Sequence, residues 1–309
     1  MEIAVVALGG NAIEDPTRQG RLDEARISLT AQSVDLLVRE GYSVVVTHGN
    51  GPQVGELQEA LLKLGSPLAS RLDLLVAMTQ GEIGYLLAES IRRVVRRESV
   101  TLCTGVLVSR DDPAFLKPTK PIGRYLNESE KEALLRLGLK VKELHVDGHK
   151  VYRQVVPSPL PIDVVELSAV KTLLENGYIV IACGGGGIPV IKSTDGPAGV
   201  NAVIDKDLAS ALLATRLDAS IFIILMAEEA VMADYGTPHQ RPIRRLSVEE
   251  AERLLNQGTL EEGSIAPKVM ACVNFTKATK KCSLITSPER LEDALKGNGG
   301  TRIVNSSNP

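Results

Sequence analysis

Two polar segments that lie close together in the sequence carry residue types that bind anions. The apolar run 179–183 ends in four consecutive glycines, Gly184–Gly187, and Asp205-Lys206-Asp207 stands directly before a helical pattern. A glycine turn after a buried strand leaves backbone N–H groups open at the sheet edge where α/β proteins bind ligands. A lysine at the start of a helix adds its charge to the helix's positive end. Alone, the glycines could be a turn and Asp207 an N-cap; together the segments predict an anion site.

Two more polar glycine turns follow predicted strands near the amino terminus. Gly9-Gly10-Asn11 follows the apolar strand 1–8, and Gly49-Asn50-Gly51 comes just after the strand 42–47. The second turn is neither a dinucleotide fingerprint nor a Walker A motif, because Val54 stands where a third glycine belongs and no Gly-Lys-Ser/Thr follows. The order strand, glycine turn, helix occurs twice, which is typical of an α/β fold with a parallel sheet.

Two isolated lysines add to the positive charge. Lys120 lies between Pro118 and Pro121, whose stiff backbone suits a charge that must be aimed, although a solvated loop lysine would look the same. Lys268 falls in the first turn of a predicted helix, where a cation is unfavourable unless an anion is also present. Lysines and glycine turns together favour phosphoryl transfer, which needs positioning and positive charge, with Mg²⁺ shielding the nucleoside phosphates. No residue pattern predicts a protein-bound metal, and His145 and His149 flank an Asp-Gly turn rather than share a helix face.

The elements that must position these residues follow from hydrophobic periodicity. Helices are predicted at 23–40, 72–97, 162–176 and from 207 onward, and buried strands at 100–108 and 219–225. Four prolines and weak periodicity mark 111–157 as an excursion from the sheet, containing one short helix with a capping box at Asn127. We expect a small lid-like subdomain there.

Composition narrows the classes of function. The chain has 309 residues, a net charge of −3 and 3% aromatic residues, which argues against a nucleic-acid binder. Its apolar runs are too short to span a membrane. Four cysteines without metal-type spacing read as reduced, mostly buried thiols of a cytoplasmic protein. A small-molecule kinase that uses ATP fits these constraints best.

The ordered motifs of the chain resemble those of carbamate kinases, in the amino acid kinase family. The segments that carry the resemblance extend over nearly the whole chain and are Leu8–Ala12, Thr47–Gly55, Pro118–Gly123, Val156–Pro159, Ala182–Val190, Ile204–Ser210 and Pro267–Val269. The resemblance implies a three-layer αβα sandwich with a mainly parallel central sheet and a protruding subdomain at about 111–157. It also implies an amino-terminal carbamate domain, 1–213, a nucleotide-binding domain, 214–309, and a homodimer formed through the first of these.

The resemblance further implies a reaction and a role for each site residue. The reaction is reversible phosphoryl transfer between ATP and carbamate, giving ADP and carbamoyl phosphate, with Mg²⁺. The implied catalytic residues are Lys120, Lys206 and Lys268, which act on the phosphoryl group, and Asp207, which organises the lysines. The implied substrate-binding residues are Gly9, Gly10, Asn11, Gly49, Asn50, Gly51, Gly185 and Gly186. The implied nucleotide-binding residues are Met226, Tyr235, Ala266 and Lys268.

One segment departs from the related kinases and keeps two alternatives open. Sister kinases carry a Thr-Asp-Val-Asp-like segment where this chain has Met226–Glu229, which affects the expected nucleotide site. One alternative is another amino acid kinase acting on a larger substrate, although the turns offer glycines and no arginine clamp, as suits a molecule as small as carbamate. The other is a nucleotide-binding sensor of the same fold without turnover.

Overall fold

A computed structural model describes residues 1–15, 21–146, 149–260 and 265–305. Within these residues, the main sheet has eight strands. In sheet order they are β15 (Arg245–Ser247), β17 (Thr301–Val304), β16 (Ser283–Thr286), β12 (Ile221–Leu225), β1 (Ile3–Leu8), β2 (Ser43–His48), β9 (Ile179–Ile181) and β3 (Ser99–Thr101). Among these described strands, neighbours run parallel except β16 and β17.

Helices cover both faces of this sheet, which makes three layers. Along β1 all six side chains are buried, and successive residues alternate between two hydrophobic clusters, as expected for a strand covered on both faces. One cluster includes side chains of α1 (Glu24–Arg39), α3 (Leu72–Val95) and α9 (Leu291–Leu295). The other includes side chains of α5 (Leu167–Glu175), α6 (Lys206–Arg216), α7 (Val248–Asn256) and α8 (Ile265–Thr279). The predicted α/β sandwich with a largely parallel sheet is confirmed.

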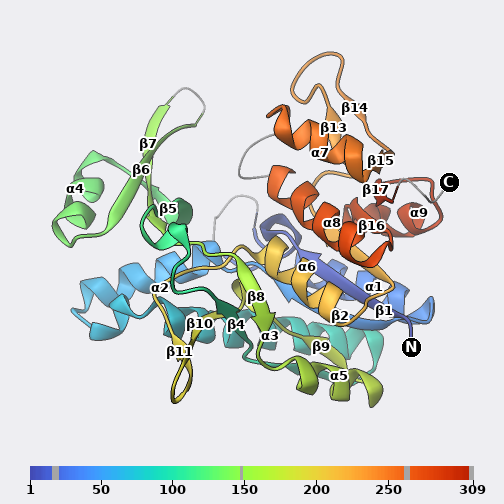
Figure 1. Cartoon of the computed structure of the whole chain (residues 1–309), viewed down its shortest axis with the longest axis horizontal. Helices are drawn as coiled ribbons and strands as arrows, with labels where there is room; N and C mark the ends of the chain where they lie inside the picture. The colour runs from blue at the N-terminus through green and yellow to red at the C-terminus, as the bar shows by residue number, and fades with distance from the viewer. Residues whose placement is uncertain (16–20, 147–148, 261–264, 306–309) are drawn as a thin grey trace.

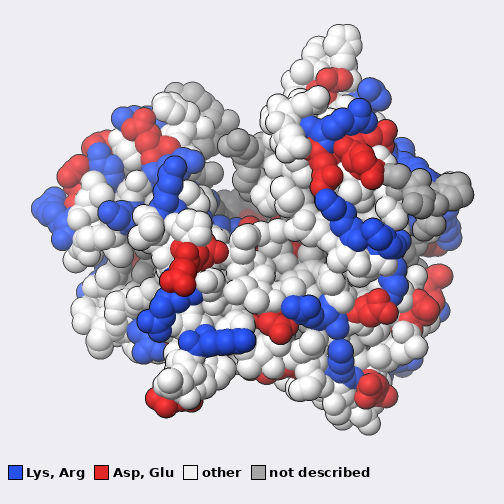
Figure 2. Space-filling model, in the orientation of Figure 1, with Lys and Arg blue, Asp and Glu red and all other residues white. Residues whose placement is uncertain are grey.

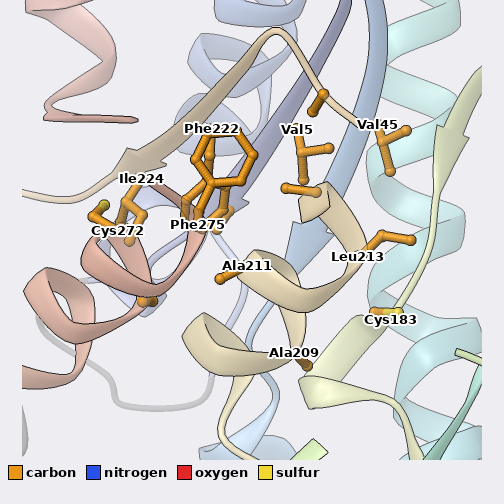
Figure 3. Close-up of a cluster of buried hydrophobic side chains, with 14 of the residues drawn as sticks. Val5, Val45, Cys183, Ala209, Ala211, Leu213, Phe222, Ile224, Cys272 and Phe275 are labelled. Carbon is orange, nitrogen blue, oxygen red and sulfur yellow. The ribbon is translucent and has the colours of Figure 1, made fainter. Parts of the chain in front are cut away.

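The second cluster holds α6 and α8 against the centre of the sheet. Phe222 of β12 and Phe275 of α8 lie with their ring centroids 5.7 Å apart, and Ala211 and Leu213 of α6 belong to the same cluster (Figure 3). α6 and α8 therefore lie side by side on one face. This packing brings the first turn of α8 close to the start of α6.

Three smaller sheets of the described residues stand outside the main one. The four-stranded sheet consists of β11 (Gly196–Gly199), β10 (Ile188–Ser193), β4 (Gly105–Val108) and β8 (Pro161–Val164), and the two-stranded sheet of β13 (Met232–Ala233) and β14 (Arg241–Pro242). The three-stranded sheet consists of β5 (Lys120–Leu126), β7 (His149–Val156) and β6 (Lys140–Val146), with α4 (Glu128–Arg136) against it, and Figure 1 shows this unit standing away from the body on the left. We call the unit 120–156 the lid. The short helix predicted between residues 111 and 157 is α4 of this unit, and its capping box at Asn127 is present.

The lid contacts the body through α2 (Gly51–Lys63). A Cβ on Gly55 of α2 would lie 2.1 Å from Gly123 Cα in β5, so the two backbones meet directly and only glycine fits. Beside this contact, Arg124 forms ion pairs with Glu59 of α2 and Glu130 of α4. The base of the lid therefore packs against α2 and is also joined to it by an ion pair.

The segment 100–108, predicted as one strand, forms two strands in two sheets. β3 ends at Thr101 in the main sheet, and β4 begins at Gly105 in the second sheet. Between them the side chain of Gln80 accepts a hydrogen bond from the Thr104 N–H at 2.8 Å. The single-strand prediction is wrong: Val100 and Thr101 are half-buried in the main sheet, Cys103 is exposed, and the buried second half joins another sheet from Gly105 onward.

The predicted helix 162–176 is also shorter than expected. Residues Pro161–Val164 form β8, antiparallel to β4, and α5 begins only at Leu167. Glu166 lies between the two elements, and its Oε2 accepts from the Gly105 N–H at 2.7 Å. A short apolar segment is compatible with either a strand or a helix, and here the sheet edge of β4 decides the outcome.

The division of the chain after residue 213 stays a prediction. The main sheet takes β1 and β2 from the first part and β12 and β16 from the second, and residue 213 lies within α6. Among the described residues, no helix combines the length and the apolar character needed to cross a membrane. All four cysteines are free thiols: Cys183 and Cys272 are buried, Cys282 is half-buried and Cys103 is exposed.

Candidate functional site

The parallel strands bring three glycine turns to one edge of the main sheet. Gly9 follows β1, Gly49 follows β2, and Gly184 comes shortly after β9. Parallel strands end on the same side, which is where open α/β sheets bind ligands. The Gly9 N–H itself donates to Leu225 O at 2.8 Å and so joins the first turn to the end of β12.

The turns after β2 and β9 interlock through side chains that need glycine opposite them. The φ angle is +64° at Gly185 and +90° at Gly186, values that glycine adopts without strain. A Cβ on Gly185 would lie 2.1 Å from Asn50 Nδ2, and one on Gly186 would lie 2.4 Å from Ile204 O. Asn50 also donates to Thr79 Oγ1 at 2.8 Å. The predicted substrate turns 49–51 and 184–187 are therefore one rigid structure.

His48, at the end of β2, fills the space beside Gly184. The residue is 1% exposed, and its Nδ1 lies 2.9 Å from Gly49 O, so the ring donates from Nδ1. Among the described residues, its buried Nε2 has no hydrogen-bond partner. Burial lowers the pKa of His48 to about 4, and the nearby charge of Lys206 lowers it as well. The hydrogen bond to Gly49 acts in the opposite direction and raises the pKa. The imidazole is therefore neutral near pH 7 and acts as a spacer that supports the two turns.

The first turn of α6 presents Lys206 to the same edge. Asp205 is the N-cap: its Oδ1 accepts from the Asp207 N–H at 2.9 Å and the Leu208 N–H at 3.3 Å. The interpretation of Asp207 as the cap is therefore wrong, because the cap and the helix start both lie two residues earlier. Lys206 Nζ donates to Leu8 O at 2.6 Å, which holds the ammonium group at the end of β1.

Asp207 joins two of the predicted catalytic lysines. Its Oδ1 lies 3.0 Å from Lys206 Nζ in an ion pair without hydrogen-bond geometry, and its Oδ2 accepts from Lys268 Nζ at 3.3 Å. The Asp207 side chain is 4% exposed. Burial alone would raise the pKa of Asp207, but Lys206 and Lys268 together hold it well below its ordinary value. Burial lowers the pKa of Lys206, which Asp207 partly restores.

Lys120 reaches the same helix from the base of the lid. Its Nζ donates to Asp205 Oδ2 at 2.5 Å. The charge of Lys120 also contributes to the low pKa of Asp207. The three lysines predicted from separate segments thus converge on the N-cap and first turn of α6, with Asp205 and Asp207 as their carboxylate partners.

A cavity of about 260 Å³ opens next to this cluster. Met226, Tyr235 and Lys268 of the predicted nucleotide site line it, together with Gly9 and Gly10. The other residues that line it are Ala227, Glu228, Ala230, Met232, Thr259, Leu260 and Ile265. In the space-filling view a notch separates the lobe of the lid from the lobe that carries α7 and β13 (Figure 2).

The cavity lining lacks one predicted nucleotide-binding residue, Ala266, and one predicted substrate residue of the first glycine turn, Asn11. Ala266 lies in the first turn of α8 and packs against the hydrophobic core rather than along the cavity. Asn11 lies in the short 3₁₀ turn Gly10–Ala12, and its side chain is outside the described part of the chain. The contribution of either residue to binding stays a prediction.

Sequence reasoning missed three groups that the structure brings to the site. Asp205 belongs to the Asp205-Lys206-Asp207 segment that predicts the anion site, but the sequence analysis assigns a role only to Asp207 and not to Asp205, which pairs with Lys120. The Leu8 carbonyl carries no sequence signal as a partner of Lys206. His48 adjoins a predicted turn, and its packing against Gly184 depends on a contact between residues far apart in the chain.

Comparison with known proteins identifies relatives over the whole length of the chain. A profile of the amino acid kinase family matches residues 2–287. The chain is 40% identical to a carbamate kinase of Clostridium perfringens, over 97% of this chain and 99% of that protein. It is 42% identical to a carbamate kinase of Halobacterium salinarum, over 98% and 99%. A solved structure of carbamate kinase from Giardia lamblia bound to AMP-PNP superposes with a TM-score of 0.86 at 37% identity, with 99% of each chain covered.

Proposed function

This chain belongs to the amino acid kinase family and is a kinase of the carbamate kinase type; from that premise we propose how its residues carry out the reaction. A carbamate oxygen attacks the γ-phosphorus of ATP, the bond from that phosphorus to the β-phosphate oxygen breaks, and carbamoyl phosphate and ADP leave. The reverse direction makes ATP. In either direction the transferring group carries negative charge that must be held and neutralised.

The observation that carries the proposal is the lysine cluster at the start of α6. Lys206 and Lys268 share Asp207, and Lys120 pairs with Asp205, all beside the glycine turns at the carboxyl edge of the sheet. Ammonium groups that are already fixed in place stabilise a transferring phosphoryl group without further reorganisation. Lys206, tied to Leu8 O, supplies a fixed charge at the centre, and Asp207 keeps the two lysines charged and apart.

The glycine turns provide the carbamate side of the site in this proposal. Carbamate is small and planar, so a pocket of backbone N–H groups suits it better than long side chains. A Cβ on Gly49 would lie 3.6 Å from Lys206 Cδ, an ordinary van der Waals contact, so this turn packs directly beside the lysine side chain. We assign carbamate contacts to Gly10, Asn11, Asn50, Gly51, Gly185 and Gly186, together with Gly9 and Gly49.

The nucleotide occupies the cavity on the other side of the cluster. Lys268 lines that cavity and also touches Asp207, so it connects the nucleotide phosphates with the transfer site. Giardia lamblia carbamate kinase binds AMP-PNP, which supports placing ATP or ADP here, with Tyr235 and Met226 near the base. Mg²⁺ enters as part of the nucleotide substrate: no cluster of three or more potential metal ligands occurs among the described residues, and phosphate oxygens and water supply the ligands that Mg²⁺ prefers.

A homodimer formed through the amino-terminal part completes the proposal. Leu74, Met78 and Tyr85 lie on one exposed face of α3, with exposed fractions of 37%, 49% and 61%. Their spacing follows the helical repeat, and Gly81 between them allows a close approach of a second helix. Met78→Asp should convert a dimer to a monomer in light scattering.

A cytoplasmic location agrees with the four free thiols.

A coupled assay of ATP formation from ADP and carbamoyl phosphate tests the proposed function. The purified chain should form ATP at a rate that depends on Mg²⁺ and on both substrates. Good phosphorylation of acetylglutamate or of a nucleoside monophosphate, without ATP formation from carbamoyl phosphate, would support a different kinase of the family. Tight ADP binding without turnover at any Mg²⁺ concentration would support the sensor alternative.

A further inference from the structure

Asp205 uses its two carboxylate oxygens for two different partners. Oδ1 caps α6 by accepting from the N–H groups of Asp207 and Leu208. Oδ2 accepts from Lys120 Nζ at 2.5 Å. The side chains of Asp205 and Lys120 are 16% and 28% exposed, so the pair is partly shielded from water. One carboxylate therefore connects the start of the catalytic helix with a lysine that comes from another unit of the fold.

Lys120 sits at the base of the lid and not at its tip. It is the first residue of β5 and pairs with Val156, the last residue of β7. The next residue, Pro157, accepts a backbone hydrogen bond from Val203 at 2.9 Å, two residues before Asp205. The backbone thus already holds the base of the lid against the segment that leads into α6, and the Asp205 side chain extends that connection to the Lys120 ammonium group.

We propose that Asp205 is a positioning residue of phosphoryl transfer, which holds the Lys120 ammonium group in register with Lys206 and Asp207. The inference rests on the proposed function and goes beyond it, because it gives a role to a residue outside the lysine–Asp207 set. Without Asp205, Lys120 would keep its backbone position but its four-carbon side chain would be free to leave the site. Holding such a side chain in one rotamer before the substrate arrives reduces the entropy lost when the reaction occurs.

The two tasks of Asp205 can be separated by substitution. Asparagine is as good an N-cap as aspartate, so Asp205→Asn keeps the hydrogen bonds to α6 and removes only the charge that attracts Lys120. Asp205→Ala removes both. Asp23 offers a matched control, because it caps α1 with its own Oδ1 accepting from the Arg26 N–H at 2.9 Å and is not part of the lysine cluster.

The test is a double-mutant cycle in the ATP-forming assay, with wild type, Asp205→Asn, Lys120→Ala and the double variant. We expect Asp205→Asn to lower kcat about tenfold, with the KM for ADP, ADP affinity and Tm close to those of wild type. In the Lys120→Ala background the same change should have no further effect on kcat. Asp23→Asn should leave kcat unchanged, and Asp205→Ala should lower Tm as well as kcat.

Three results would overturn the inference. Full activity of Asp205→Asn would show that Lys120 needs no partner. An equal loss of kcat with and without Lys120 would show that Asp205 acts independently of that lysine. A loss of kcat in Asp205→Asn that follows a fall in Tm would reduce Asp205 to a helix cap. An inactive wild type would instead count against the proposed function, so the two failures are distinguishable.

Discussion

The buried imidazole of His48 makes the stability of the fold depend on pH in a way that can be calculated. In the folded chain its pKa is about 4, while a histidine in an unfolded chain has a pKa near 6.5. Between these values the unfolded chain binds a proton that the folded chain does not, so the free energy of unfolding falls as the pH is lowered. The contribution of His48 to the free energy of unfolding is about 3 kcal/mol at high pH and is fully lost below pH 4. About 2 kcal/mol of it is lost between pH 8 and pH 5.

Urea unfolding of wild type and His48→Gln at pH 8 and pH 5 measures this contribution. Both proteins will lose stability from other groups that titrate, so the comparison is between the two pH dependences rather than the two stabilities. We expect the free energy of unfolding to fall by about 2 kcal/mol more in wild type than in His48→Gln. His239→Gln is the matched control for the substitution itself, because it makes the same change at an exposed position.

Equal pH dependence in wild type and His48→Gln would refute the reasoning. It would mean that the imidazole gains a proton in the folded chain as easily as in the unfolded one, in spite of an exposure of 1%. His48→Asn provides a second replacement should the glutamine variant unfold too readily to be measured. Activity at pH 6 should not decline through His48, since the ring is neutral there.

Three further substitutions test the lysine cluster, each by steady-state kinetics with ADP binding measured separately. Lys120→Ala should lower kcat by about 10²–10³ with unchanged ADP affinity, because its charge acts on the transferring group, and near-normal turnover would mean a solvated loop lysine. Lys268→Ala should weaken ADP binding as well as turnover, since it lines the nucleotide cavity; unchanged ADP affinity would contradict this placement. Asp207→Asn removes a carboxylate that raises the pKa of Lys206, which burial already lowers. The residual activity of the variant should therefore rise as the pH is lowered and Lys206 gains its proton. A pH–activity profile parallel to that of wild type would argue against this effect of Asp207 on Lys206.

The features that depend on local sequence could be predicted. The strands that precede Gly9, Gly49 and Gly184 follow directly from apolar runs broken by glycine, and the capping box predicted at Asn127 is present in the structure. These signals act within a few residues, so one stretch of sequence contains them completely.

The features that depend on distant partners could not be predicted. The segment 100–108 contains a polar break at Thr104-Gly105, but the contact of Thr104 with Gln80 comes from α3, far away in the sequence. The pairing of Asp205 with Lys120 spans 85 positions and requires the lid to be placed first. Sequence patterns thus predicted most of the charged residues that meet at the start of α6, whereas the assignment of each lysine to its carboxylate required the fold.

The balance of charge at the start of α6 explains why the cluster favours an anion. Three ammonium groups, of Lys120, Lys206 and Lys268, face two carboxylates, of Asp205 and Asp207. Among the ion pairs of the described residues, the ammonium groups thus outnumber the carboxylates at the positive end of a helix, where burial disfavours the charged form of Lys206. Loss of Asp207 would remove the carboxylate that Lys206 and Lys268 share. In the proposed function this arrangement keeps the lysines charged while an anionic phosphoryl group binds beside them.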